Sequence, residues 1–339
     1  MSAKPIFTAT APATSRSAVS LPRGMCHIAL ALAVLTGAAA LPAPPLHAQA
    51  APSAQPALAI NFNNVNDDQL PLYIAKSNGV VGLLNTSLRA SESWHRYLSW
   101  VDVKRGPTGK ERIIYGLYSV SESSARDAIA KARESANAEP AIPTLDGATK
   151  DLADAFDALY PVLNEAEAYY ERKDYLSDGM AGGKALHARI APAAMKFIAA
   201  RERMNILQDQ FKDQLDLFQL ARIEKAEGKS FDWHSRNTMR LASKAVDLMP
   251  RDPRRGADLR EFDAALKAFG DATRDLDNSA RESGKSSRVH SDARSILGSL
   301  REMRDDIAKG RVNGMSYSMN AQSVIMRYNM MVSMSNAFR

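Results

Sequence analysis

The sequence has one cysteine among its 339 residues, and it contains no apolar run long enough to cross a membrane as a helix. The cysteine, Cys26, precedes the most apolar stretch of the chain, Ile28–Leu41. If this region is removed on export, the remaining chain forms no disulfide, no thiolate metal site and no cysteine nucleophile. A lipid acceptor would stand just after the apolar stretch, so the position of Cys26 also predicts a protein without a lipid anchor.

The chain also lacks a strong excess of one charge. Its 44 lysines and arginines face 38 acidic residues, for a net charge of +6, and the two signs alternate along the sequence. The densest basic cluster, Arg251, Arg254 and Arg255, stands among prolines and aspartates in a loop. Because nucleic-acid binding requires a concentrated basic face, we expect no nucleic-acid partner.

Residues 1–50 have the organisation of a secretory signal peptide. Arg16 and Arg23 precede the apolar run Ile28–Leu41, and Ala48-Gln49-Ala50 supplies a cleavage site of small residues. The run is about 14 residues long, shorter than the roughly 20 that a transmembrane helix needs. We therefore predict cleavage after Ala50, no membrane span afterwards, and a periplasmic or secreted protein.

Good helix formers dominate the rest of the chain, and period-two alternation of β-branched residues is nearly absent, which predicts an all-α fold. We expect a disordered Ala/Pro linker at 51–65 and one helical domain at 66–339. Turn residues separate about eight expected helices, at 66–104, 110–135, 146–174, 184–227, 231–248, 257–281, 287–309 and 315–337. Prolines 161 and 192 are expected to kink or break the third and fourth helices. The pattern favours an elongated helical bundle, or two sub-bundles that share the long helix at 184–227.

Two aromatic segments, 94–118 and 169–187, are the most distinctive parts of the sequence. Together they resemble the YiiG-like family of bacterial envelope proteins, a domain of unknown function found mostly in predicted lipoproteins. The matching residues are Tyr97, Ser99, Trp100, Val101, Gly106 to Arg112, Tyr115, Gly116, Tyr169, Tyr170, Lys173, Asp174, Tyr175, Asp178, Gly179, Gly183, Lys184 and His187. The resemblance covers most of the chain after residue 66 and brings no activity or ligand with it. The chain departs from the family in lacking a lipid-acceptor cysteine.

The same segments contain candidates for a ligand site, in which aromatic rings line a cleft and basic side chains bind an anion. The candidate residues are Tyr97, Trp100, Lys110, Arg112, Tyr115, Asp174, Lys184 and His187. The alternative is structural. Tyr97 and Trp100 are three residues apart, as are Tyr115 and Tyr118, so the two pairs could pack face to face across a hairpin.

Catalytic signatures are absent from the sequence, which contains neither H-E-x-x-H nor G-x-S-x-G. The string Gly-Pro-Thr-Gly-Lys at 106–110 lacks the spacing of a phosphate-binding loop and no strand precedes it. One catalytic hypothesis is a hydrolase that uses His187 with Asp174 or Asp178 as an acid–base pair. We favour no catalytic residues, no resident metal and no cofactor.

The last expected helix is rich in methionine, with six between residues 315 and 334. Thioethers bind soft copper(I), which makes a copper site a further hypothesis. However, Met319, Met326, Met330 and Met334 follow seven-, four- and four-residue spacings, which predicts a buried core stripe.

The sequence as a whole predicts an exported, non-catalytic helical envelope protein that binds another envelope protein or a small ligand. Hydrolysis and copper binding are the two alternatives. The oligomeric state stays open.

Overall fold

The computed structural model describes residues 58, 60, 62, 65, 66, 68–250, 253 and 258–337, with side chains to residue 333. The expected signal peptide at 1–50, most of the expected linker at 51–65 and the basic cluster of Arg251, Arg254 and Arg255 lie outside this part of the chain.

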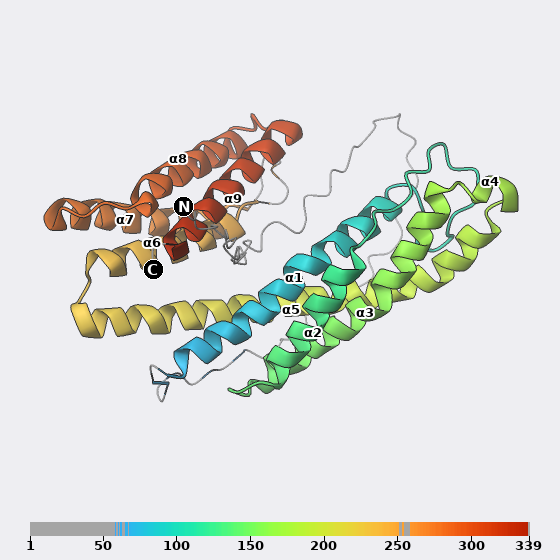
Figure 1. Cartoon of the computed structure of the whole chain (residues 1–339). Coiled ribbons are helices and arrows are strands. Elements are labelled where there is room, and N and C mark those ends of the chain that lie inside the picture. Colours follow the sequence, from blue (N-terminus) through green and yellow to red (C-terminus); the bar gives the residue numbers. More distant parts are fainter. Residues whose placement is uncertain are drawn as a thin grey trace, which may run out of the picture.

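Two bundles of α-helices lie side by side, and a long helix runs along both (Figure 1). The described residues form nine helices and no strand, which confirms the all-α prediction. The first bundle consists of α1 (Leu70–Leu98), α2 (Glu122–Asn137), α3 (Pro143–Glu171), the short α4 (Tyr175–Asp178) and α5 (Ala181–Glu227). The second consists of α6 (Phe231–Asp247), α7 (Arg260–Ser283), α8 (Arg288–Ala308) and α9 (Gly314–Ala337).

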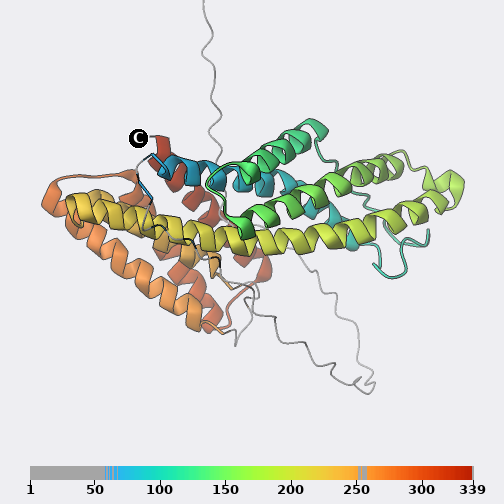
Figure 2. The same ribbon diagram turned by 90° about the horizontal axis from the view of Figure 1, so that it is seen from below.

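Helix α5 connects the two bundles. Its 47 residues correspond to about 70 Å of helix. The part of α5 up to Phe211 buries Ile190, Phe197 and Phe211 in the core of the first bundle, and Figure 2 shows the rest of the helix continuing alongside the second bundle. There Arg240 on α6 pairs with Asp213 on α5, with 3.2 Å between Nη1 and Oδ1.

Each bundle has its own hydrophobic core. The first core is formed mainly by α1, α2, α3 and α5 up to Phe211, whereas the second draws its residues from α6 to α9. Buried phenylalanines illustrate the division, because Phe156 lies in the first core and Phe269 in the second, both without solvent exposure.

Several expected helix limits were wrong. The second helix was expected from residue 110, but α2 begins at Glu122, after Ser121 accepts a hydrogen bond from the Ser124 amide as its N-cap. Residues 110–121 form no regular element because side chains of neighbouring helices bind their backbone. The Tyr118 amide donates to Ser93 Oγ at 3.1 Å, and the Val120 amide donates to Asn164 Oδ1 at 2.7 Å. Neither Pro161 nor Pro192 ends its helix, so of the expected kink or break the break does not occur.

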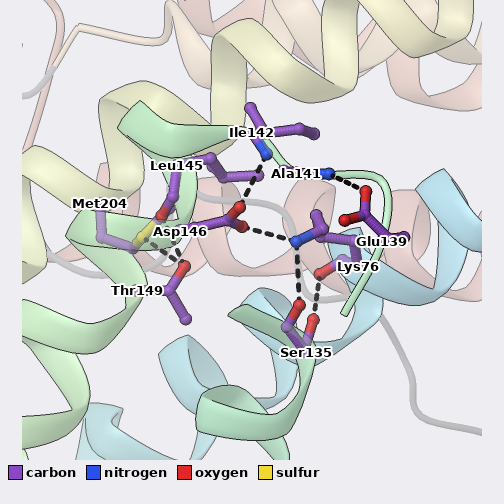
Figure 3. Close-up of polar contacts among 9 residues, drawn as sticks. All are labelled: Lys76, Ser135, Glu139, Ala141, Ile142, Leu145, Asp146, Thr149 and Met204. Carbon is purple, nitrogen blue, oxygen red and sulfur yellow. Dashed lines mark hydrogen bonds and ion pairs between the residues drawn. The ribbon is translucent and has the colours of Figure 1, made fainter. Parts of the chain in front are cut away.

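A buried ion pair ties three segments of the first bundle together (Figure 3). Lys76 on α1 is 3% exposed, and its Nζ lies 2.6 Å from Asp146 Oδ1 on α3. Lys76 also donates to the Ser135 carbonyl near the end of α2, at 2.9 Å. Asp146 Oδ2 accepts from the Ile142 amide at 2.7 Å, so both charged groups have hydrogen-bonding partners.

The methionines of α9 contradict the prediction of a core stripe. Met319, Met326 and Met330 are exposed, together with Met315, whereas Met331 is fully buried. The side chain of Met334, the fourth member of the predicted stripe, lies outside the described residues. The face that packs against the second core consists of Ala321, Val324, Ile325, Tyr328 and Met331. The α9 sequence therefore has two apolar faces, and the methionine-rich one points to solvent.

Candidate functional site

The two aromatic segments meet at one end of the first bundle. Tyr97, near the end of α1, lies edge-on to Trp100 with ring centroids 5.3 Å apart, and Trp100 lies edge-on to Tyr170 at 5.0 Å. The Tyr97 ring is also 5.8 Å from the imidazole of His187 on α5. We call this region, formed by residues 99–121 and 172–187, the loop end.

His187 joins the loop to α5 through both ring nitrogens. Nε2 lies 3.1 Å from the Val103 carbonyl oxygen, which can only accept, so we assign the hydrogen to Nε2. Nδ1 then accepts from the Tyr97 hydroxyl at 3.0 Å. Gly106 packs directly on this imidazole, and a Cβ at that position would lie 2.8 Å from His187 Cδ2. The histidine therefore holds the loop against the helix.

Buried aromatic groups form the base of the loop end. Burial raises the pKa of both the Tyr97 and the Tyr170 hydroxyls well above the ordinary value of 10, so both stay protonated. The indole Nε1 of Trp100 donates to the Gly116 carbonyl at 3.1 Å. Tyr97 and Trp100 thus pack on the neighbouring segment and support the loop.

The carboxylates of the loop end bind groups of the protein itself. Glu111 accepts from the Thr108 amide at 2.6 Å and from the Gly109 amide at 2.9 Å. Partial burial raises the pKa of Glu111, but these hydrogen bonds outweigh it and hold the pKa below its usual value. Asp102 similarly accepts from two amides of its own turn.

The two acidic residues at 172–187, Asp174 and Asp178, also bind groups of the protein. Asp178 accepts from the Tyr169 hydroxyl at 2.9 Å and from the Met180 and Gly182 amides at the start of α5. Desolvation raises the pKa of Asp178, but these hydrogen bonds together lower it. Asp174 binds the guanidinium of Arg172, with 2.6 Å between Oδ2 and Nη2.

The basic residues of the loop end have few such partners. Residues 99–121 and 172–187 of the loop end contain seven lysines and arginines and four carboxylates, and the basic residues remain in excess if Glu171, at the end of α3, is counted. In the described structure, five of the basic side chains make no ion pair or side-chain hydrogen bond and are exposed. They are Lys104, Lys110, Arg112, Lys173 and Lys184. Tyr115, with 47% of its surface exposed, lies beside them in the sequence.

The candidate residues therefore divide into two groups. Tyr97, Trp100 and His187 come together in the packed base, whereas Lys110, Arg112, Tyr115 and Lys184 are exposed side chains of the same two segments. Asp174 belongs to neither group because Arg172 holds it. The expected pairing of Tyr115 and Tyr118 with Tyr97 and Trp100 across a hairpin is not what these tyrosines do.

Arginines of α1 contact the two loop tyrosines instead. The guanidinium of Arg96 lies 4.5 Å from the Tyr118 ring centroid, and its Nη2 donates to the Tyr115 carbonyl at 2.7 Å. The guanidinium of Arg89 also lies over the Tyr118 ring, 3.9 Å from its centroid. These contacts hold the loop on α1 and leave the Tyr115 side chain exposed.

The arrangement supplies no acid–base pair of the kind that the hydrolase hypothesis requires. Both nitrogens of His187 bind Tyr97 and Val103, while Asp174 and Asp178 have the separate partners described above. Among the described residues, no group of three or more His, Cys, Asp or Glu side chains could hold a metal ion.

Sequence reasoning missed the residues that anchor the loop: Ser93, Thr108, Glu111 and Asn164. The Thr-x-x-Glu spacing at 108–111 was the one available signal, because it is the spacing at which a carboxylate can accept from the backbone amides of a preceding turn. Ser93 and Asn164 gave no local signal, since their partners are 25 and 44 residues away in sequence.

The helices of the described structure place this protein in the all-α class, and sequence comparison gives its family. A family described as "Protein of unknown function (DUF3829)" matches residues 71–337. This chain belongs to that family.

A curated relative is the "Uncharacterized protein YiiG" of Escherichia coli (strain K12), which is 30% identical over 211 residues. The match covers 62% of this chain and 58% of the relative, so it spans little more than half of that protein. These findings confirm the resemblance to the YiiG-like family. No solved structure matches the chain. None of the helices within the described ranges is long and apolar enough to cross a membrane.

Proposed function

We propose that this protein is an exported, non-catalytic helical protein that binds an anionic group of an envelope partner or small ligand at the loop end. The observation that carries the proposal is the imbalance of available charge. Hydrogen bonds within the loop end occupy its four carboxylates, whereas five exposed cations have no such partner.

The geometry of the loop supports binding more than catalysis. The packed base of Tyr97, Trp100 and His187 holds the loop against α5, so the exposed cations of these segments extend from a supported backbone. Arg112 offers a planar donor group suited to carboxylate or phosphate, and Lys110 and Lys184 offer point charges. The exposed ring of Tyr115 adds an apolar surface with a polar hydroxyl, a combination enriched at binding interfaces.

A charge-matched pair of variants tests this proposal. The loop variant Lys110→Gln/Arg112→Gln/Lys184→Gln removes three positive charges from the loop end. The control Lys150→Gln/Lys196→Gln/Lys285→Gln removes three exposed charges elsewhere. The probes are citrate, inorganic phosphate and a polyglutamate peptide, titrated at about 20 and 200 mM salt, because screening weakens exposed electrostatic contacts.

We expect at least one probe to bind the wild-type protein and the control equally, more weakly at high salt, and the loop variant about tenfold more weakly. Equal losses in the loop variant and the control would mean that net charge, and not this site, governs binding. Measurable hydrolysis of an ester or amide substrate that disappears in His187→Gln would contradict the non-catalytic assignment.

Export has a separate test. The arrangement of Arg23, the apolar run Ile28–Leu41 and Ala48-Gln49-Ala50 supports cleavage after Ala50. N-terminal sequencing of the protein recovered from cell fractions should begin at Ala51, and the protein should lie outside the cytoplasm. Recovery of an uncleaved cytoplasmic chain would exclude export while leaving the loop-end measurement valid.

A further inference from the structure

Among its described side chains, helix α9 exposes four methionines to solvent. Met315, Met319, Met326 and Met330 have 66%, 65%, 68% and 46% of their surface exposed. They are not part of the second core, which α9 contacts through its opposite face. The four side chains are large, apolar and sulfur-containing, and the loop-end proposal gives them no role.

The four methionines lie on one face of the helix. Successive residues of an α-helix are rotated by about 100°, so the spacings of four, seven and four residues place all four within a sector of about 60°. They form two i,i+4 pairs, Met315 with Met319 and Met326 with Met330. The Cβ atoms of such a pair are about 5–6 Å apart, and the flexible thioether chains can converge on one point between them.

The composition of this face distinguishes it from a general apolar patch. Within the described part of the second bundle, all of the exposed large apolar side chains are methionines. Between the two pairs, the same face carries Gln322 and Ser323, both exposed. Leucine, isoleucine, valine and phenylalanine, which would serve a hydrophobic interface equally well, occur in this bundle without being exposed there.

We propose that the methionine face of α9 binds a soft monovalent metal ion, copper(I), with one ion at each i,i+4 pair of thioethers. Thioether sulfur is a soft ligand that selects copper(I), whereas carboxylate and carbonyl oxygens select harder ions. The binding step is coordination alone, with no change in oxidation state and no proton released, because the thioether is neutral. Solvent completes the coordination of each ion.

The two pairs form two sites. Met315 and Met326, the first residue of each pair, are separated by 11 residues and therefore by about 16 Å along the helix axis. One ion cannot bridge that distance. The proposal therefore gives a stoichiometry of two ions per chain, and it is independent of the loop end, which lies in the other bundle.

Silver(I) is a suitable probe because it has the same charge and softness and does not change oxidation state in air. The full chain would carry Cys26→Ser, so that the one thiol does not compete. We expect two silver ions per chain by titration calorimetry, one in Met315→Leu/Met319→Leu, and none at these sites when all four methionines are leucine. Leucine keeps the face apolar and changes the side-chain volume little.

Met195 supplies the matched control. It is exposed to a similar extent, 62%, and has no methionine three or four residues away on α5, so Met195→Leu should leave the stoichiometry at two. Copper(I), supplied without oxygen against a competing chelator, should give the same pattern across the variants.

A second measurement does not depend on the variants folding. With the methionine methyl groups labelled with carbon-13, silver(I) should shift the signals of Met315, Met319, Met326 and Met330 and leave those of buried Met204, Met303 and Met331 in place. Unchanged binding in the fourfold leucine variant, or methyl signals that do not move, would overturn the proposal. If the fourfold leucine variant loses no silver ion and still binds a protein partner, the methionine face serves hydrophobic contact and not metal binding.

Discussion

Single side chains in this protein do more to position segments than to perform chemistry, and Lys76 is the clearest case. Its ammonium group contacts α3 through Asp146 and the end of α2 through Ser135, in a site with almost no solvent (Figure 3). Such a pair is no proof of high stability, since removing two charges from water is costly. Its contribution becomes visible when one partner is removed.

We expect Lys76→Met to lower the free energy of unfolding by about 3–5 kcal/mol, because Asp146 would stay buried without its counter-charge. The double variant Lys76→Met/Asp146→Leu should lose less, since no buried charge remains. Chemical denaturation measures both. Lys131→Met is the control, because its pair with Asp127 is exposed and should contribute less than about 1 kcal/mol. A similar small loss for Lys76→Met would show that water reaches the site.

Gly106 is the second residue whose neighbours fix its identity. Its φ of +70° is unfavourable for other residues, and an added Cβ would meet the His187 ring. Gly106→Ala should therefore cost about 2–4 kcal/mol, from backbone strain together with the overlap. Gly284→Ala isolates the strain, since Gly284 has a φ of +66° and open space around it, and should cost about 1–2 kcal/mol. Equal losses at the two glycines would mean that His187 moves aside.

At the scale of elements, helices were predictable and their solvent-facing sides were not. Most helix positions followed from periodicity and turn residues, because both act locally. Residues 110–121 were wrongly assigned to a helix. The side chains that bind their backbone, Ser93 and Asn164, belong to helices that are close in space but 25 and 44 residues away in the sequence. The methionines of α9 were wrongly assigned to the core because two apolar stripes share that helix, and spacing alone cannot rank them. The surface cations of the candidate site were identifiable, but the internal pairing of its carboxylates required the fold.

The loop end should loosen in acid before the rest of the helices unfold. Hydrogen bonds hold the pKa values of Asp102, Glu111 and Asp178 below their ordinary values, so these groups stabilise the folded loop end above about pH 4.5. This contribution is lost as the pH falls through their lowered folded-state pKa values. In Trp233→Phe, the fluorescence of Trp94 and Trp100 reports on the loop end, and it should change in acid before the helical circular dichroism does.

Glu111→Gln provides the control for this acid transition. The amide can still accept from Thr108 but cannot be protonated in this range, so the fluorescence change should shrink. A change of the same size and midpoint in Glu111→Gln would assign the transition to other carboxylates.

At the scale of the whole molecule, α5 joins two bundles whose cores share no residue, so each core should unfold as its own cooperative unit. Phe269→Ala should destabilise the second bundle by about 3–5 kcal/mol and leave the first nearly unchanged, and Phe156→Ala should do the reverse, because each ring is fully buried in one core. Tryptophans report on each bundle separately: Trp233 lies on α6, whereas Trp94, near the end of α1, and Trp100, at the loop end, belong to the first bundle. Denaturation followed in single-tryptophan variants should give two midpoints, of which each alanine substitution moves one. If the midpoints of both probes shift together in either variant, the bundles unfold as one unit. The contacts of α5 with α6, including the pair of Arg240 with Asp213, would then couple the two cores. In that case a ligand bound at the loop end would stabilise the methionine face as well.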